Sequence, residues 1–388
     1  MKAPGGRGRI ALLAVLAVLV ATPIVVSAAC SSAGGATGYA PRTRTYYLAA
    51  DEVRWNYYPV PANSADRNAL TGKPLGDTEN TFLLRGPDRI GSTYLKSLYR
   101  EYTDATFTKL SPRPPQWEHL GMLGPALHAV VGDRVDIVFK NNLDHPASIH
   151  MHGLEYDKKD EGAPYVDGAG GESRLDGQVP PGGTHTYHYM VPERSGPGPM
   201  DPSSIMWMYH SHTEEVTDDY AGLTGAVLVT RADAARADGT PSDVDREIVL
   251  QFQVQDENQS SYLDRNITTF AGRPDSVQKD DEGFVESNLM HSINGYLYGS
   301  QPLESLAFRR GEHIRWYLMG MGTEVDLHTP HWHGNTVTFM GMRTDVVSLL
   351  PATMVVADMT PDAPGSWLLH CHVNDHITAG MSTRYQVK

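Results

Sequence analysis

Cysteine is almost absent from this chain, which has only Cys30 and Cys371 in 388 residues. A disulfide framework is therefore excluded, because small disulfide-stabilised folds need several paired cysteines. After residue 30 the sequence also lacks an apolar run long enough to predict a membrane span. Positive charge is scarce as well: 32 Lys and Arg stand against 46 Asp and Glu, a net charge of −14. That balance disfavours nucleic acid as a partner.

The N-terminus has the composition of an export signal. Lys2, Arg7 and Arg9 precede an apolar run from residue 10 to residue 26, and small residues follow up to Ala29. This order predicts a secretory signal over residues 1–29, so the protein is expected outside the cytoplasm, in the medium or the cell envelope. Loss of the signal removes three positive charges and no negative ones, leaving −14 − 3 = −17.

Cys30 lies directly after this signal and is followed by small residues up to Gly34. The segment resembles a bacterial lipoprotein signal, in which the cysteine carries a lipid anchor and a flexible tether follows. Under this interpretation residues 30–44 form the tether. Ordinary signal cleavage close to Cys30 remains the alternative.

The rest of the chain predicts an all-β fold. The sequence contains 37 Gly and 26 Pro, and short β-branched runs such as 134–139 and 226–229 alternate with turn residues. A stretch poor in large apolar residues precedes the strand-like run 247–252, and we predict a linker there, over residues 232–244. The linker would separate a first domain, 45–231, from a second, 245–388.

The two predicted domains repeat one another. His150-Met151-His152-Gly153 aligns with His331-Trp332-His333-Gly334, and Tyr209-His210-Ser211-His212 aligns with Leu369-His370-Cys371-His372. Matched motifs in the same order indicate a duplicated fold. Alternate residues of a strand point to one face, so each His-x-His pair directs two imidazoles into the same space. Several such strands can enclose metal ions, and imidazole suits copper, iron, nickel and zinc alike.

The last motif singles out copper. One thiolate, two imidazoles and a distant thioether are the ligands of a blue-copper electron-transfer site, and Cys371, His328, His376 and Met381 supply that set. On a strand, Cys371 faces away from both His370 and His372. A three-residue segment can therefore serve one metal site on each side.

These motifs, in this order, resemble the copper-binding motifs of the multicopper oxidase family, which includes laccases, ascorbate oxidase and ceruloplasmin. The resemblance covers about residues 120–388 and implies two cupredoxin-like Greek-key β-sandwich domains with four copper ions per functional unit. It implies that His328, Cys371, His376 and Met381 hold a type 1 copper. It assigns His150 and His331 to a type 2 copper, and the type 3 pair to His152, His210 and His372 on one ion and His212, His333 and His370 on the other.

The first domain lacks every type 1 ligand where the repeat would place it. Ala147 stands in the position of His328, Ser211 of Cys371, Val216 of His376 and Leu223 of Met381. We therefore expect one mononuclear site per chain, located in the second domain, and a cluster built from histidines of both domains.

The resemblance implies a copper-dependent oxidase that reduces dioxygen to water, and the main expectation is a laccase acting on phenols or aromatic amines. Segments 161–167 and 191–196 resemble ceruloplasmin-type domains, which keeps a metallo-oxidase acting on ferrous or cuprous ions as the alternative. Copper electron transfer or buffering without oxygen chemistry would leave eight histidines unexplained. The two-domain bacterial small laccases, which the chain also resembles, imply a homotrimer whose clusters form between neighbouring chains.

Other polar side chains close to the motifs have more than one interpretation. Tyr156 resembles a tyrosine beside the cluster of small laccases, where it would lend an electron during oxygen reduction, and ordinary packing is the alternative. Glu161 and Asp326 lie near ligand histidines and would deliver protons or orient an imidazole, unless they are structural carboxylates.

Overall fold

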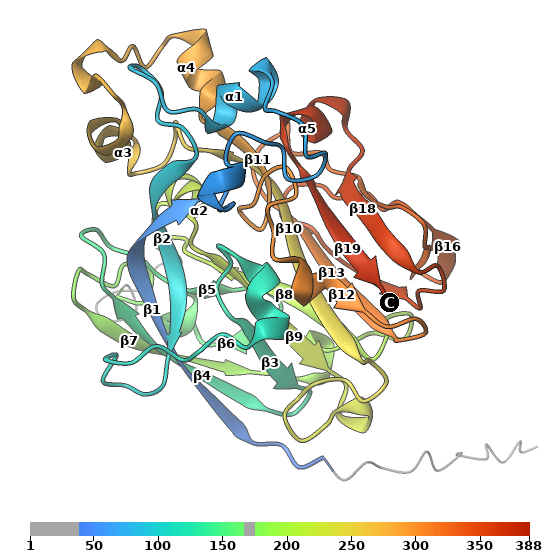
Figure 1. The fold of residues 1–388 in the computed structure, drawn as a ribbon. Coiled ribbons are helices and arrows are strands. Elements are labelled where there is room, and N and C mark those ends of the chain that lie inside the picture. Colours follow the sequence, from blue (N-terminus) through green and yellow to red (C-terminus); the bar gives the residue numbers. More distant parts are fainter. Residues whose placement is uncertain (1–38, 167–174) are drawn as a thin grey trace, which may run out of the picture. The chain divides into compact units, whose positions relative to one another are not determined.

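The computed structural model describes residues 39–166 and 175–388 (Figure 1). The predicted export signal, Cys30 and most of the predicted tether lie outside these residues and remain predictions. In the part of the chain that is described, no helix is long and apolar enough to cross a membrane.

Residues 43–230 contribute the strands of two sheets. The first sheet has the order β2-β1-β4-β7-β6 and the second the order β3-β9-β8-β5. Their strands are β1 (Thr43–Asn56), β2 (Thr93–Tyr102), β3 (Ala126–Val130), β4 (Arg134–Asn141), β5 (His150–Met151), β6 (Glu155–Tyr156), β7 (Thr184–Met190), β8 (Ser204–His210) and β9 (Thr224–Thr230).

Residues 246–387 form two further sheets, with the orders β11-β10-β13-β17-β15-β16 and β12-β19-β18-β14. Their strands are β10 (Arg246–Asp256), β11 (Leu289–Ile293), β12 (Ala307–Phe308), β13 (Ile314–Gly320), β14 (Pro330–Trp332), β15 (Val337–Phe339), β16 (Met342–Thr344), β17 (Met354–Met359), β18 (Gly365–Cys371) and β19 (Ser382–Val387).

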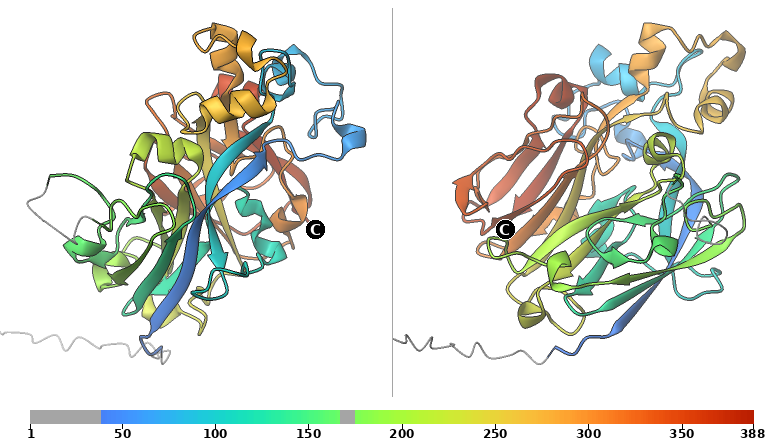
Figure 2. Two further views of the ribbon diagram at one scale, coloured as in Figure 1. Left: turned by 90° about the vertical axis from the view of Figure 1, so that its left-hand side faces the viewer. Right: turned by 180° about the vertical axis from the view of Figure 1, so that it is seen from behind.

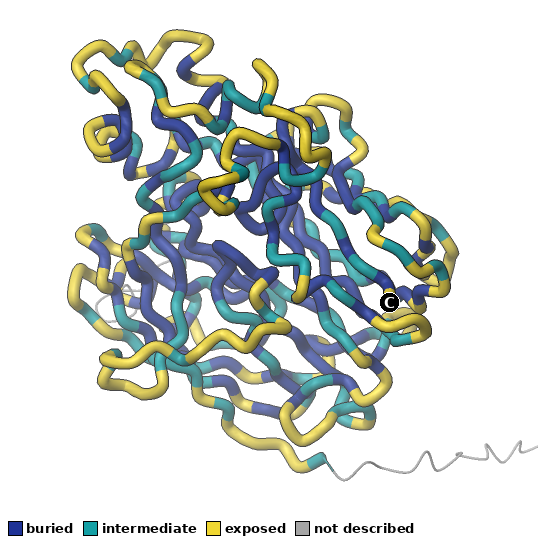
Figure 3. The backbone as a smooth tube through the Cα atoms, viewed as in Figure 1, coloured by how far each residue is buried: buried dark blue, intermediate teal, exposed yellow. Residues whose placement is uncertain are grey.

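Each pair of sheets encloses its own apolar core. In β4 every second residue is buried, as expected for a strand with one face toward a core. The first core includes Ile137, Phe139 and Tyr187, and the second includes Trp316, Trp332 and Cys371. Figure 3 shows the buried backbone concentrated along these strands. The prediction of an all-β sandwich fold is confirmed.

Several short helices lie together at one end of the molecule (Figure 2), and two of them contact β11. The α-helices are α1 (Asp77–Leu83), α2 (Glu215–Ala221), α3 (Leu263–Phe270), α4 (Glu282–Ser287) and α5 (Asn374–Ala379). Helices α1, α3, α4 and α5 contribute to a third core, which joins Phe82 and Tyr94 to Phe284 and Leu297. The 3-10 segments are η1 (Ala62–Ser64), η2 (Pro115–Leu120), η3 (Lys158–Asp160), η5 (Glu193–Ser195), η6 (Ala232–Ala234), η7 (Pro274–Ser276) and η8 (Leu303–Leu306).

A fourth core joins the two halves of the chain. It packs Met206 and Met208 of β8 against Met319 of β13 and Val249 of β10. Strand β9 ends at Thr230 and β10 begins at Arg246, so the predicted linker at 232–244 falls between the two sheet pairs. The division into two domains at that linker stays a prediction.

Candidate metal centres

The histidines of the first half form one compact set. Strands β5 and β8 pair antiparallel with His150 opposite His210, which brings the two motifs together. The ligand atoms of His150, His152 and His210 all lie within 4.8 Å of one another. His152 Nε2 is 3.1 Å from His210 Nε2, and the His212 ring lies 5.3 Å from that of His150.

Backbone carbonyls orient these imidazoles. His150 Nδ1 lies 2.7 Å from the carbonyl oxygen of Glu161, and His210 Nδ1 lies 3.0 Å from that of Ser211. A carbonyl only accepts, so Nδ1 must carry the proton, which leaves the Nε2 lone pair free for a metal. Burial, reinforced by neighbouring imidazoles, lowers the pKa of His152 and of His210 to about 4. These side chains are therefore neutral, as metal ligands must be.

The second half repeats this geometry. The ligand atoms of His331, His333 and His370 lie within 4.8 Å of one another, and His333 Nε2 is 3.1 Å from His370 Nε2. His331 Nδ1 lies 2.9 Å from the Asp345 carbonyl oxygen, and His370 Nδ1 lies 2.7 Å from that of Cys371. The ring of the exposed His372 is 5.3 Å from that of His370. All eight predicted cluster histidines thus fall into two matched sets of four.

The glycine after each His-x-His pair is explained by close packing. Gly153 has a φ of +72°, and a Cβ there would lie 2.2 Å from the ring of Trp207. Gly334 has a φ of +74°, and a Cβ there would lie 2.4 Å from the ring of Trp367. Only glycine adopts this backbone conformation without strain while a tryptophan covers the turn. The His-x-His-Gly motif is therefore a structural unit in both halves.

The remaining predicted ligands form a third, separate group. Cys371 Sγ lies 3.6 Å from His376 Nδ1 and 3.9 Å from His328 Nδ1, and the two nitrogens are 3.2 Å apart. All three side chains are buried, and Met381, with no exposed surface, belongs to the same core as Cys371. Burial opposes ionisation of the thiol, but hydrogen bonds from His328, His376 and the Thr329 N–H lower the pKa of Cys371 to about 6.

Ser211 occupies the position of Cys371 in the first half, and its hydrogen-bond partners are not imidazoles. The Ser211 hydroxyl donates to Asp218 Oδ2 at 2.6 Å and accepts the Ser148 N–H at 3.2 Å. Val216, in the position of His376, is 54% exposed. The two helices that follow, α2 and α5, both end at a left-handed glycine, Gly222 and Gly380, so the repeat extends beyond the ligands.

Two of the three weaker sequence candidates, Tyr156 and Glu161, lie beside the first histidine set. The Tyr156 ring is half-buried, 6.1 Å from that of His150 and 6.0 Å from that of Tyr189. The group of Glu161 that reaches His150 is its backbone carbonyl, whereas its carboxylate binds Lys158 and accepts the Tyr165 hydroxyl at 2.9 Å. Their predicted roles in electron and proton transfer remain predictions.

A cavity of about 480 Å³ opens beside the group formed by Cys371, His328 and His376, which we call the thiol group. The cavity lining includes His376. Glu286 at the end of α4, His291 in β11 and Asp375 at the start of α5 also line it. The rings of His291 and His376 are 5.3 Å apart. Burial, followed by His376, lowers the pKa of His291 to about 4. These three residues belong to no recognisable motif, so the sequence alone does not reveal them.

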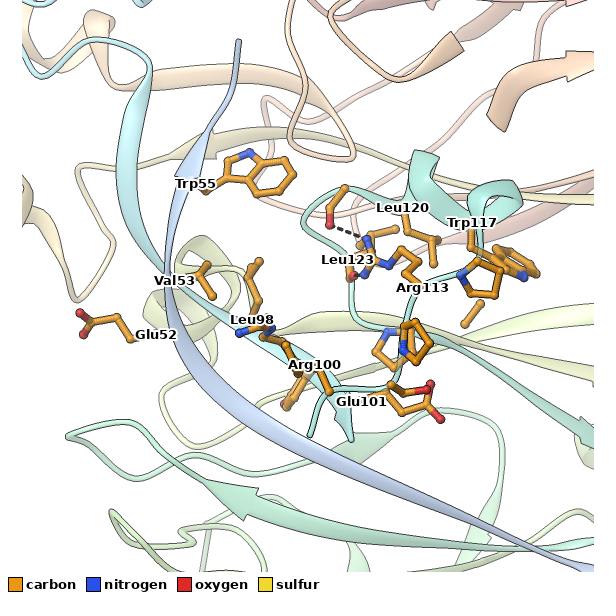
Figure 4. A pocket seen from close by; sticks show the side chains of 18 of the residues that line it. Glu52, Val53, Trp55, Leu98, Arg100, Glu101, Arg113, Trp117, Leu120 and Leu123 are labelled. Carbon is orange, nitrogen blue, oxygen red and sulfur yellow. Dashed lines mark hydrogen bonds between the residues drawn. The ribbon is translucent and has the colours of Figure 1, made fainter. Parts of the chain in front are cut away.

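A larger cavity lies elsewhere. It measures about 970 Å³ and is bordered by β1, β2 and the segment 110–126, with Trp55, Arg100, Arg113 and Trp117 among its lining residues (Figure 4). None of the histidines in the three groups lines this cavity. Size therefore does not identify the functional site here.

The donor sets fit copper. A buried thiol with a lowered pKa, two Nδ1 atoms and a buried methionine match a blue-copper site, and two sets of four imidazoles match a histidine-bound copper cluster. The fold and these donor sets are those of a copper-binding protein of cupredoxin-like architecture. Multicopper oxidase domain signatures match residues 118–234 and 273–388. The chain belongs to the multicopper oxidase family, whose members use dioxygen and a reducing substrate.

The relatives with similar sequences include ferroxidases. The chain is 45% identical over 348 residues to human ferroxidase HEPHL1, covering 89% of this chain and 29% of that protein. It is 43% identical over 351 residues to human hephaestin and 44% identical over 347 residues to human ceruloplasmin, again covering 89% of this chain. It therefore spans less than a third of the length of these relatives.

Solved structures share the fold. A crystal structure of a multicopper oxidase aligns with a TM-score of 0.53 and 16% identity over 90% of both chains. The blue copper oxidase from Nitrosomonas europaea aligns with a TM-score of 0.52 and 18% identity, over 89% of this chain and 86% of that one.

Proposed function

We propose that this protein is a metallo-oxidase that oxidises ferrous iron and reduces dioxygen to water. The observation that carries this proposal is the cavity beside His376, whose lining includes two carboxylates and an imidazole next to a candidate copper ligand. The similarity to proteins named ferroxidase supports it. The alternative expected from the sequence is thus favoured over the main expectation, a laccase acting on phenols.

The cavity suits a small cation better than a phenol. Glu286 and Asp375 are exposed carboxylates, and His291 Nδ1 lies 2.8 Å from the Leu289 carbonyl oxygen, which leaves its Nε2 free. Carboxylate and imidazole together are suitable ligands for ferrous iron. In the described structure these three donors are not all within 4.8 Å of one another, so the exposed carboxylates would turn inward when iron binds.

Copper held by the thiol group would accept single electrons, and copper held by the histidine sets would reduce dioxygen. The protein positions these groups through short connections. Asp375, which lines the cavity, is covalently next to His376, and His376 contacts the Cys371 thiol. Cys371 is in turn bonded to His370 and His372 of the second histidine set. Four ferrous ions supply the electrons that, with four protons, convert one dioxygen into two waters.

We further propose a homotrimer in which each copper cluster forms between two chains. No ring contact or hydrogen bond joins a histidine of the first set to one of the second among residues 39–166 and 175–388. Neither set of four imidazoles is sufficient for one type 2 and two type 3 ions. A head-to-tail ring of identical chains would bring the first set of one chain to the second set of its neighbour.

Neutralising the cavity carboxylates tests the substrate. We expect Glu286→Gln combined with Asp375→Asn to raise KM for ferrous iron roughly 10-fold or more, because these carboxylates would bind the ion. Oxidation of a bulky aromatic diamine, which needs no cation site, is expected to stay within about twofold. Steady-state oxygen uptake with each reductant measures both effects.

Glu282→Gln is the matched control, because Glu282 lies one turn earlier on α4 and does not line the cavity. This variant is expected to keep the wild-type KM for iron. An unchanged KM for iron in the double variant, or an equal loss with both reductants, would contradict a ferrous-iron site at this cavity.

A further inference from the structure

Asp326 is a buried carboxylate directly beside one of the candidate copper ligands. Its side chain is buried, and its Oδ1 lies 3.1 Å from Nε2 of His328. The backbone of Gly322, four residues earlier, packs directly against this carboxylate. Gly322 has a φ of +108°, and a Cβ there would lie 2.1 Å from Asp326 Oδ2. Asp326 is therefore held in place by the fold before any metal binds.

Two backbone groups hold the carboxylate. The Val254 N–H of β10 donates to Oδ1 at 2.7 Å, and the Thr323 N–H donates to Oδ2 at 2.9 Å. Because both donors belong to the backbone, the direction of the carboxylate is set by β10 and by the loop before β14. The remaining bond is the one to His328, whose other nitrogen faces Cys371 and His376.

The two histidines of this site are therefore not equivalent. His376 lines the cavity, and in the described structure no carboxylate is hydrogen-bonded to it. His328 is buried, does not line this cavity and is fixed by Asp326. One imidazole borders the cavity and the other is anchored in the core.

We propose that Asp326 is a positioning residue for the type 1 copper: it holds His328 in its Nε2–H form and lowers the reduction potential of copper bound at Nδ1. This inference rests on the proposed type 1 site. A carboxylate that accepts the second N–H of a metal-bound imidazole makes the ligand more electron-rich and fixes its orientation. A buried negative charge at this distance also favours the cupric over the cuprous state, because the low-dielectric interior screens it weakly.

Asp326→Asn tests this assignment. The variant removes the charge and keeps the shape, so we expect the copper reduction potential to rise. A shift of about tenfold in the cuprous-to-cupric equilibrium corresponds to about 59 mV for one electron. Asp219→Asn is the control, since Asp219 is a second buried carboxyl, bonded to Thr224 and Gln253 but not to His328. That variant is expected to keep the wild-type potential.

A measurement on the wild-type protein covers the case in which Asp326→Asn fails to fold. In ¹⁵N NMR spectra of the cuprous form, which is diamagnetic, His328 is expected to show a protonated, slowly exchanging Nε2. An unchanged potential in a copper-loaded Asp326→Asn variant, or an unprotonated Nε2 in the wild type, would overturn the inference. A wild-type protein without any thiolate-to-copper absorption band would instead refute the type 1 site itself.

Discussion

Co-expression of two inactive variants is expected to restore about a quarter of the wild-type oxidase activity, if clusters form between neighbouring chains of a ring. One variant carries His150→Ala and His152→Ala in the first histidine set. The other carries His331→Ala and His333→Ala in the second set. A cluster is intact only where an undamaged first set meets an undamaged second set, which random assembly gives in about one half times one half of the contacts.

The control co-expresses the first variant with a chain that carries all four substitutions. No combination of these two chains contains an intact first set, so oxygen uptake is expected to stay at the level of the inactive variants. Different affinity tags on the two chains would confirm that mixed oligomers form. Mixed oligomers without restored activity would place all cluster ligands within one chain and contradict the proposed trimer.

Cys371→Ser is expected to abolish iron-dependent oxygen uptake and the visible absorption band of the copper-loaded protein. A hydroxyl does not replace a thiolate as a copper ligand, and the fold has already lowered the pKa of this thiol to about 6. His331, His333 and His370 make no hydrogen bond to the thiol, so copper binding at the histidine sets is expected to persist. Absorption and electron paramagnetic resonance spectra together with metal analysis separate these effects.

Ser211→Ala provides the matched control in the first half, because Ser211 occupies the position of Cys371 in the repeat. Its hydroxyl bonds Asp218 and contributes only to local structure, at a cost of roughly 1 kcal/mol of stability when removed. The visible band is expected to remain in this variant. A visible band that survives in Cys371→Ser would contradict the assignment of the thiol as a copper ligand.

The histidine geometry was predictable because it follows from strand periodicity. The His-x-His pairs point to one side of their strands, and Cys371 points to the other side from His370. In the first half Ser211 stands in the position of Cys371, and no cysteine–histidine group forms among its described residues. These features depend on spacing along a single strand, so a sequence contains them in full.

The cavity proposed to bind iron could not be predicted in the same way. Glu286 and His291 are more than eighty residues before Asp375, and they line one cavity with it because β11 packs beside α5 and α4 packs beside β11. Glu161 shows the opposite case. Its sequence position suggested a catalytic carboxylate, but its carbonyl oxygen contacts the histidine while its carboxylate binds Lys158. Side-chain direction in loops is decided by tertiary packing, which no single sequence pattern encodes.

The ratio of ferrous iron oxidised to dioxygen consumed tests the proposed function most directly. Electrons would pass from iron in the cavity, through the thiol group, to the two histidine sets. The copper-loaded wild-type protein is therefore expected to oxidise four ferrous ions for each dioxygen without releasing peroxide. A ratio of two with peroxide accumulating would show that the histidine sets do not complete oxygen reduction, and no iron-dependent uptake at all would contradict the proposed ferrous substrate.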